Sequence, residues 1–184
     1  LSSSSAASDV YKRQAVAGTN AGEATGDVRK HVKDSGPFPA PLALNVVPWA
    51  GSLKEDGYTS EELKVRNESR KILGMPRLKV SATCVRVPVL TTHSLAVHAT
   101  FKNEVTRKGA QKLLEKAAGV TLLDDPENKK FPTPNDAVGT DATWVGRVRR
   151  SPDDKKSLDL FLCGDNLRKG CLLYTSDAAD EEDS

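Results

Sequence analysis

The sequence predicts an α+β fold with a largely antiparallel, mixed sheet and helices on one face of that sheet. Strand-like segments follow one another in runs, at 79–89, 93–101, 144–150 and 158–163. Helical patterns at 59–74 and 106–119 stand between some of these runs and do not follow every strand. A doubly wound parallel sheet requires regular alternation of strand and helix, so this order favours α+β.

Each predicted helix carries end signals in its sequence. Thr59 with Glu62 three residues later forms a capping box, and Gly74 ends the first helix. Thr106 begins the second helix, which Gly119 closes. These signals fix the two helices more firmly than their apolar periodicity does.

The predicted strands differ in pattern. Residues 42–47 form a short apolar strand between prolines, and 79–89 is rich in β-branched residues. Residues 93–101 alternate, which places the following side chains on one face: His93, Leu95, Val97, Ala99 and Phe101. The polar turn 151–157 joins the last two predicted strands, 144–150 and 158–163.

Composition excludes several classes of protein. The 184 residues hold 27 Lys+Arg and 25 Asp+Glu, a net charge of +2, which excludes a strongly basic nucleic-acid binder. No apolar run approaches the roughly 20 residues of a membrane-spanning helix. Cys84, Cys163 and Cys171 show neither metal-ligand spacing nor a disulfide framework, so we expect no metal site. A reducing cytoplasm is the predicted compartment.

The two ends of the chain, 1–14 and 171–184, differ from the rest. Residues 9–14 can be encoded by GAT GTG TAT AAG AGA CAG, and the reverse complement of that string encodes Cys171 and the residues that follow it, up to Thr175. We therefore interpret both ends as translated sequencing-library adapter and expect one domain over 15–170. Residues 171–184 are rich in acidic side chains. Residues 15–170 therefore carry a larger net positive charge than the whole chain.

Arg86 and His93 are the first candidates for chemistry. Arg86 shares its predicted strand face with apolar side chains, where a guanidinium requires an anionic partner or must reach solvent. His93 begins the next strand on its apolar face, as a general acid/base or as a core-edge histidine bonded to backbone. His98 falls on the opposite face and is expected to be solvated.

Two further features lie at helix ends. Glu61 and Lys64 are three residues apart on one helix, either as a surface ion pair or as a charged pair that grips a zwitterionic or phosphate-bearing ligand. Asp165 and Asn166 follow the last strand as helix N-cap candidates, a position that suits anions or nucleotides but also ordinary capping.

Several long blocks resemble the bacterial aspartate-semialdehyde dehydrogenases. They are VRNESRKILGMP, ATCVRVPVLTTHSLAVHATF and FLCGDNLRKG, together with QAVAGTNAGE and PLALNVVPWAGSLKEDGYTSEELK. The blocks are collinear and cover essentially all of 15–170. The resemblance implies a fold similar to the C-terminal domain of glyceraldehyde-3-phosphate dehydrogenase-like enzymes.

The resemblance also implies roles for individual residues. It makes His93 the general acid/base, Arg86 the clamp on the substrate α-carboxylate, and Lys64 the phosphate ligand. The other implied site residues are Glu61 and Gln14 at the substrate and Ala17, Gly18 and Asn166 at the cofactor. The implied reaction is NADPH-dependent reductive dephosphorylation of L-4-aspartyl phosphate, which serves lysine (through diaminopimelate), threonine and methionine biosynthesis.

The resemblance places the nucleophilic cysteine and most of the NADP site upstream of this chain. We therefore expect the chain alone to be inactive, and its parent to be a cytoplasmic homodimer or dimer of dimers that binds neither nucleic acid nor membrane. Two alternatives remain open: a catalytically silent paralogue that serves subunit association, and another acyl-phosphate reductase such as the N-acetylglutamyl phosphate enzyme.

Overall fold

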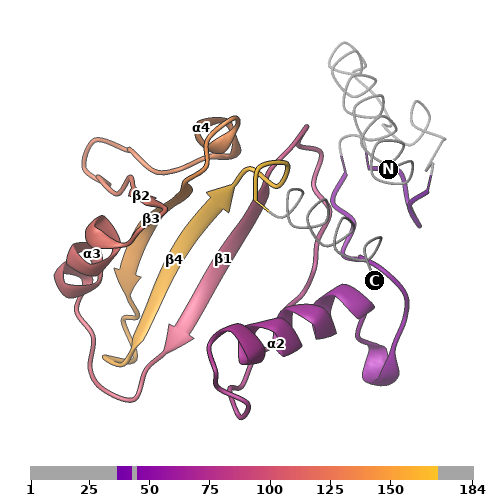
Figure 1. Ribbon diagram of the computed structural model, residues 1–184, viewed down its shortest axis with the longest axis horizontal. Helices are drawn as coiled ribbons and strands as arrows, with labels where there is room; N and C mark the ends of the chain where they lie inside the picture. Colours follow the sequence, from indigo (N-terminus) through magenta and orange to yellow (C-terminus); the bar gives the residue numbers. More distant parts are fainter. Residues whose placement is uncertain (1–36, 43–44, 170–184) are drawn as a thin grey trace, which may run out of the picture. The chain divides into compact units, whose positions relative to one another are not determined.

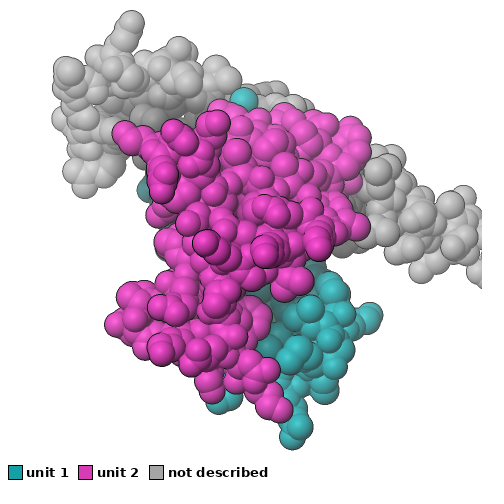
Figure 2. Space-filling view, turned by 90° about the vertical axis from the view of Figure 1, so that its left-hand side faces the viewer, with its two compact units in different colours: residues 1–90 teal, residues 91–184 magenta. Residues whose placement is uncertain are grey.

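A computed structural model describes residues 37–42 and 45–169 of the chain, which divide into two compact units after Leu90 (Figures 1 and 2). The predicted adapter segments, 1–14 and 171–184, lie outside the described residues, as do Gln14, Ala17 and Gly18. The domain boundaries at 15 and 170 therefore stay predictions. The two units are described separately.

The first unit is built around α2, Ser60–Ile72, which is preceded by the short 3-10 helix η3, Glu55–Gly57. The predicted capping box is present: Thr59 is the N-cap and its N–H donates to the Glu62 carboxylate at 2.8 Å. Arg70 and Lys71 lie in the last turn, where positive charge suits the helix dipole. Gly74 follows with a φ of +63°, the left-handed conformation that glycine adopts readily.

The predicted strands at 42–47 and 79–89 are wrong as regular strands. In the part of the first unit that the structure describes, the two segments pair at a single antiparallel bridge between Val47 and Arg86. Val47 N–H donates to Arg86 O at 3.0 Å, and Arg86 N–H donates to Val47 O at 2.8 Å. Pro48 and Pro88 lie close to the bridge and lack the N–H groups that a longer ladder would need.

The second unit contains a four-stranded sheet in the order β1-β4-β3-β2 (Figure 1). Its strands are β1 His93–Thr100, β2 Val120–Leu122, β3 Thr143–Arg150 and β4 Ser157–Gly164. β4 pairs antiparallel with both β1 and β3, whereas β2 runs parallel to β3. The predicted mixed, largely antiparallel sheet is confirmed, and β3 and β4 pair across the turn 151–157.

Two helices pack against this sheet. α3, Arg107–Lys116, contacts β2 and β3, and its N-cap Thr106 accepts the Gly109 N–H at 3.1 Å. The short helix α4, Pro134–Ala137, contacts β3 and β4. Neither β2 nor α4 is expected from the sequence, because three or four residues carry too little periodicity to stand out.

The core of the second unit lies between the sheet and the segments that cover it. Its buried apolar residues come from β3, β4 and α4: Val145, Val148, Leu158, Cys163 and Ala137. Gly146 is required in β3 because a Cβ there would collide with the backbone of Leu123 and with Pro132. Among the described residues, none of the helices is long and apolar enough to cross a membrane.

Candidate functional site

In the first unit, two predicted site residues lie on α2. The side chains of Glu61 and Lys64 are 3.9 Å apart and each is about half exposed, 48% and 47%. The predicted pairing at i,i+3 spacing is confirmed. Because both groups face solvent, their mutual attraction is screened, and both remain available to an incoming ligand.

Glu62, next to Glu61, points inward and connects α2 to the segment that carries Arg86. One carboxylate oxygen accepts the Thr59 N–H, and the other accepts the Cys84 N–H at 3.0 Å. The residue is only 8% exposed. These backbone N–H groups hold the pKa of the Glu62 carboxyl below its ordinary value, since they stabilise the charged form.

Arg86 lies two residues beyond that contact, and its burial follows the predicted alternation. Val80, Ala82, Cys84 and Arg86 are half-buried, whereas the residues between them are exposed. The Arg86 guanidinium carbon lies 4.9 Å from the centre of the Phe38 ring, within the range of a cation–π contact. This contact places the guanidinium over the Phe38 ring, and the bridge to Val47 holds the backbone of Arg86.

Arg86 also lines a cavity of about 490 Å³ in the first unit. The other lining residues are Pro37, Phe38, Pro39, Trp49 and Gly51. Trp49 donates its indole N–H to Gly51 O at 3.0 Å, so a hydrogen bond between two lining residues holds this part of the cavity wall. A planar cation at an apolar wall suits a carboxylate, which can accept two parallel hydrogen bonds from it.

The second unit carries His93 at the start of β1, where it is exposed. It shares a face with Leu95 and Val97, as the alternation predicts, and its register partner on β4 is Gly164. On the opposite face, the His98 side chain is 58% exposed and its Nδ1 is 2.8 Å from an Asp159 carboxylate oxygen. The prediction that His98 is solvated is confirmed.

The residue before His93 is held in an unusual conformation. Thr92 has a φ of +84°, which is strained for a β-branched residue. Its N–H donates to Asn166 Oδ1 at 2.7 Å, and Thr91 Oγ1 lies 3.0 Å from the same oxygen. Asn166 therefore fixes the turn that leads into His93, a contact between residues 74 apart that no local pattern reveals.

Asp165 anchors the segment that carries Asn166. It is 4% exposed, and its carboxylate accepts the Gly139 N–H at 2.7 Å and the Leu167 N–H at 2.8 Å. The bond from Gly139 is the largest cause that lowers the pKa of this carboxyl. The expected cap at the strand end is thus present, although it closes a turn and not a regular helix in the described residues.

The two described cysteines lie in apolar or hydrogen-bonded surroundings. Cys163 is fully buried and its Sγ lies 3.2 Å from Thr133 O. Burial raises the pKa of the Cys163 thiol, and burial together with the charge of Glu62 raises the pKa of the Cys84 thiol. A nucleophilic cysteine needs the opposite shift, so neither thiol is suited to attack an acyl group.

The predicted site residues thus fall into three groups. Glu61, Lys64 and Arg86 belong to the first unit, and His93 and Asn166 belong to the second. Gln14, Ala17 and Gly18 lie outside the described residues. Sequence reasoning missed the roles of Phe38, Glu62 and Thr92; only the capping box at Glu62 gave a signal in advance.

Comparison with known proteins agrees with these local features. Residues 10–169 match the family described as semialdehyde dehydrogenase, dimerisation domain. A curated relative, the aspartate-semialdehyde dehydrogenase of Corynebacterium melassecola, is 51% identical over 151 residues, 80% of this chain. This chain spans 42% of the length of that relative.

Solved structures extend the similarity to three dimensions. Aspartate semialdehyde dehydrogenase II from Vibrio cholerae, in complex with ASA, is 35% identical with a TM-score of 0.71, over 74% of this chain and 40% of that one. Aspartate semialdehyde dehydrogenase with NADP from Candida albicans has a TM-score of 0.56 at 21% identity, over 72% and 42% of the respective chains. The second similarity supports the fold alone.

Proposed function

Because this chain belongs to the semialdehyde dehydrogenase dimerisation-domain family, we propose that it is the catalytic and dimerisation part of an aspartate-semialdehyde dehydrogenase. The proposed reaction is the NADPH-dependent reductive dephosphorylation of L-4-aspartyl phosphate to the semialdehyde and phosphate. One observation carries the proposal: the half-buried Arg86 guanidinium, stacked on Phe38, lines a cavity with no carboxylate on its wall in the described residues. The pathway products and a cytoplasmic location stay predictions.

The residues of the first unit have the chemistry to bind such a substrate. The fork of Arg86 would donate two parallel hydrogen bonds to the α-carboxylate. On α2, Glu61 would face the ammonium group and Lys64 the phosphoryl group. An acyl phosphate expels phosphate more readily when a cation neutralises the departing charge, which is the role proposed for Lys64.

His93 would move the proton in this reaction. In the parent enzyme a cysteine thiol outside this chain would lose its proton to an imidazole nitrogen of His93, and the thiolate would attack the acyl carbon. The same imidazolium would return the proton as the tetrahedral intermediate resolves. Asn166 and Thr92 set where β1 begins, so they position His93 without touching substrate.

NADPH, when bound, would supply the hydride that reduces the thioester. Of the residues that the resemblance assigns to the cofactor, the structure describes Asn166 alone. Its Oδ1 accepts the Thr92 N–H, which fixes the orientation of the amide and leaves Nδ2 as a donor without a partner among the described residues. An amide donor of this kind fits a carboxamide oxygen, so Asn166 is suited to that role.

A homodimer is the proposed assembly. Leu95 on β1 and Phe101 just beyond it are each 44% exposed, and the β4 partner of Leu95 is Leu162, which is half-buried. Exposed apolar side chains on an edge strand of a sheet are typical of a surface that another protein covers. Light scattering should give twice the mass of the protomer, and Leu95→Glu should give the monomer.

The proposed function is tested on the complete parent enzyme, which requires the full-length gene. Phosphate-dependent oxidation of aspartate semialdehyde with NADP⁺ should be measurable, and Arg86→Lys should lower kcat/KM by about 100-fold because the planar fork is lost. His93→Asn should lower kcat by roughly 100-fold or more. Arg77→Lys, on an exposed residue outside the cavity, is the matched control.

Four outcomes would contradict the proposal. Near-wild-type kinetics for Arg86→Lys would remove the clamp, and turnover by the 184-residue chain alone would contradict its predicted inactivity. A parent gene without a nucleophilic cysteine would instead identify a silent paralogue. Preference for N-acetylglutamyl phosphate, which has no free ammonium group, would assign the chain to the other acyl-phosphate reductases.

A further inference from the structure

A second cavity, of about 430 Å³, lies in the second unit beside the end of β3, and arginines dominate its lining. Four of its nine lining residues are arginine: Arg107, Arg147, Arg149 and Arg150. Asp124 is the only acidic residue among the nine. This cavity contains none of the residues assigned above to substrate or cofactor.

A β-bulge creates this concentration of charge. Gly146 pairs with Phe161 and Arg149 pairs with Asp159, so Arg147 and Val148 together oppose one residue of β4. Arg147 has a φ of +55°, a left-handed conformation that non-glycine residues avoid, and Val148 is 1% exposed. The bulge breaks the alternation of β3, buries Val148 and leaves Arg147 and Arg149 exposed on either side of it.

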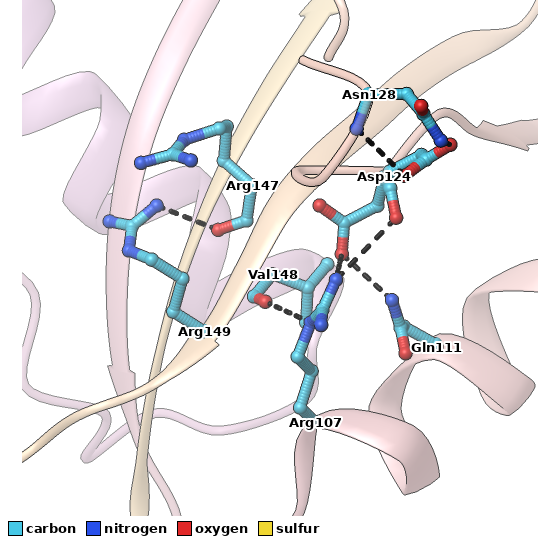
Figure 3. Close-up of polar contacts among 8 residues, drawn as sticks. Arg107, Gln111, Asp124, Asn128, Arg147, Val148 and Arg149 are labelled. Carbon is cyan, nitrogen blue, oxygen red and sulfur yellow. Dashed lines mark hydrogen bonds and ion pairs between the residues drawn. The ribbon is translucent and has the colours of Figure 1, made fainter. Parts of the chain in front are cut away.

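The acidic residue of the lining is already neutralised. The Asp124 carboxylate is 3% exposed; it accepts from Arg107 Nη2 at 3.1 Å and from Gln111 Nε2 at 2.8 Å (Figure 3). Arg107 Nε donates to Val148 O at 2.9 Å, which ties the pair to the bulge. The charges of Asp124 and Arg107 thus neutralise each other, and the charges of Arg147, Arg149 and Arg150 remain.

Those three arginines have no carboxylate partner among the residues that the structure describes. Arg149 Nη1 donates to Arg147 O at 2.8 Å, so its guanidinium is oriented by backbone and not by an anion (Figure 3). Asp159 pairs with His98, and Asp154 accepts from Ser157 and Lys156. Asp153, three residues after Arg150, is exposed and forms no ion pair with these arginines among the described residues. The cavity therefore carries an uncompensated positive charge.

We propose that this cavity is a binding site for a small multivalent anion that carries phosphate groups. Guanidinium forks pair with phosphate oxygens through parallel charge-assisted hydrogen bonds, and several forks together favour an anion with more than one charge. The bulge, held by buried Val148 and by the bond from Arg107 to Val148 O, places Arg147 and Arg149 at this cavity. The site is independent of the proposed function and of the phosphate role assigned to Lys64 in the first unit.

The test titrates inorganic pyrophosphate into the ¹⁵N-labelled 184-residue chain, followed by amide chemical shifts and by calorimetry. Saturable shifts should centre on 147–151, and Arg147→Gln with Arg149→Gln should weaken binding at least tenfold. Arg147→Gly is a second variant, which removes one guanidinium while suiting the left-handed conformation, so it should keep the fold.

Two controls separate this site from others. Arg77→Gln removes the same charge elsewhere on the surface and should bind pyrophosphate as the unaltered chain does. Lys64→Gln removes the proposed substrate-phosphate ligand, and in it the shifts at 147–151 should saturate as they do in the unaltered chain. Shifts spread over the whole surface would overturn the proposal. So would equal binding by the double variant, or loss of binding in Lys64→Gln.

Discussion

The Glu62 carboxylate on α2 accepts the backbone N–H of Cys84, 22 residues further along the chain, at 3.0 Å. Its other oxygen caps α2 at Thr59, so one buried side chain fixes both the start of the helix and the segment that ends in Arg86. The guanidinium proposed to bind substrate is thus placed by a carboxylate that need not touch substrate.

Glu62→Ala should lower Tm by about 5 °C, because it leaves two buried N–H groups without their acceptor. Glu62→Gln retains an acceptor oxygen and should lie between the wild type and the alanine variant. Glu68→Ala, on the same helix but exposed, is the control and should leave Tm unchanged. Thermal unfolding measured by circular dichroism checks all three, and equal Tm values for the two alanine variants would contradict the role of Glu62.

Thr92→Gly should stabilise the chain by about 1 kcal/mol, because the φ of +84° strains a β-branched residue and not glycine. The substitution also removes a buried hydroxyl that has no hydrogen-bond partner among the described residues. Thr121→Gly in β2, outside the positive-φ residues, should have the opposite sign. Urea unfolding measures both variants, and a destabilised Thr92→Gly would count against strain at this turn.

Asn166→Ala should expose the Thr92 N–H, which donates to Asn166 Oδ1 at 2.7 Å. Hydrogen exchange of that amide should become about fivefold faster or more, since a lost hydrogen bond is worth about 1 kcal/mol or more. Asn166→Asp keeps the acceptor oxygen and should preserve most of the protection. Unchanged exchange in Asn166→Ala would show that Thr92 is held by other contacts.

Asp165 should make folding sensitive to acid. Its pKa in the folded chain is lowered, first by the Gly139 N–H, so its contribution to stability is present above the unfolded-state value near 3.9. That contribution is lost as the pH falls through the folded-state pKa. Asp165→Asn should therefore cost about 1.5–3 kcal/mol at pH 7 and progressively less below pH 4. Asp153→Asn is the exposed control, and parallel pH curves for wild type and Asp165→Asn would contradict this account.

Cys84 and Cys163 should react slowly with iodoacetamide at pH 7.5 in the folded chain. Their thiol pKa values are raised, so little thiolate is present, and Cys163 is also inaccessible. In urea both should react at the rate of an ordinary thiol. Peptide mass spectrometry distinguishes the two cysteines. Rapid labelling of either one in the folded chain would contradict the conclusion that neither thiol is suited to be the nucleophile.

Local patterns in the sequence were sufficient for several elements. The capping box at Thr59 and Glu62, the N-cap at Thr106 and the alternation of 93–101 predicted α2, α3 and β1, because each depends on residues within one or two turns. The i,i+3 pairing of Glu61 and Lys64 follows from helix geometry in the same way. The order of these elements was enough to favour an antiparallel, mixed sheet.

Only the tertiary structure decided how distant residues support the site. Three contacts join residues between 22 and 74 positions apart in the sequence. They are the hydrogen bond from Cys84 to Glu62, the cation–π contact of Arg86 with Phe38, and the hydrogen bond from Thr92 to Asn166. The left-handed residues Thr92 and Arg147 are equally invisible beforehand, since their side chains favour other conformations and surrounding contacts impose the strain. Interactions between residues close in sequence determine the helices and strands of this protein, and long-range packing determines where its charged groups lie.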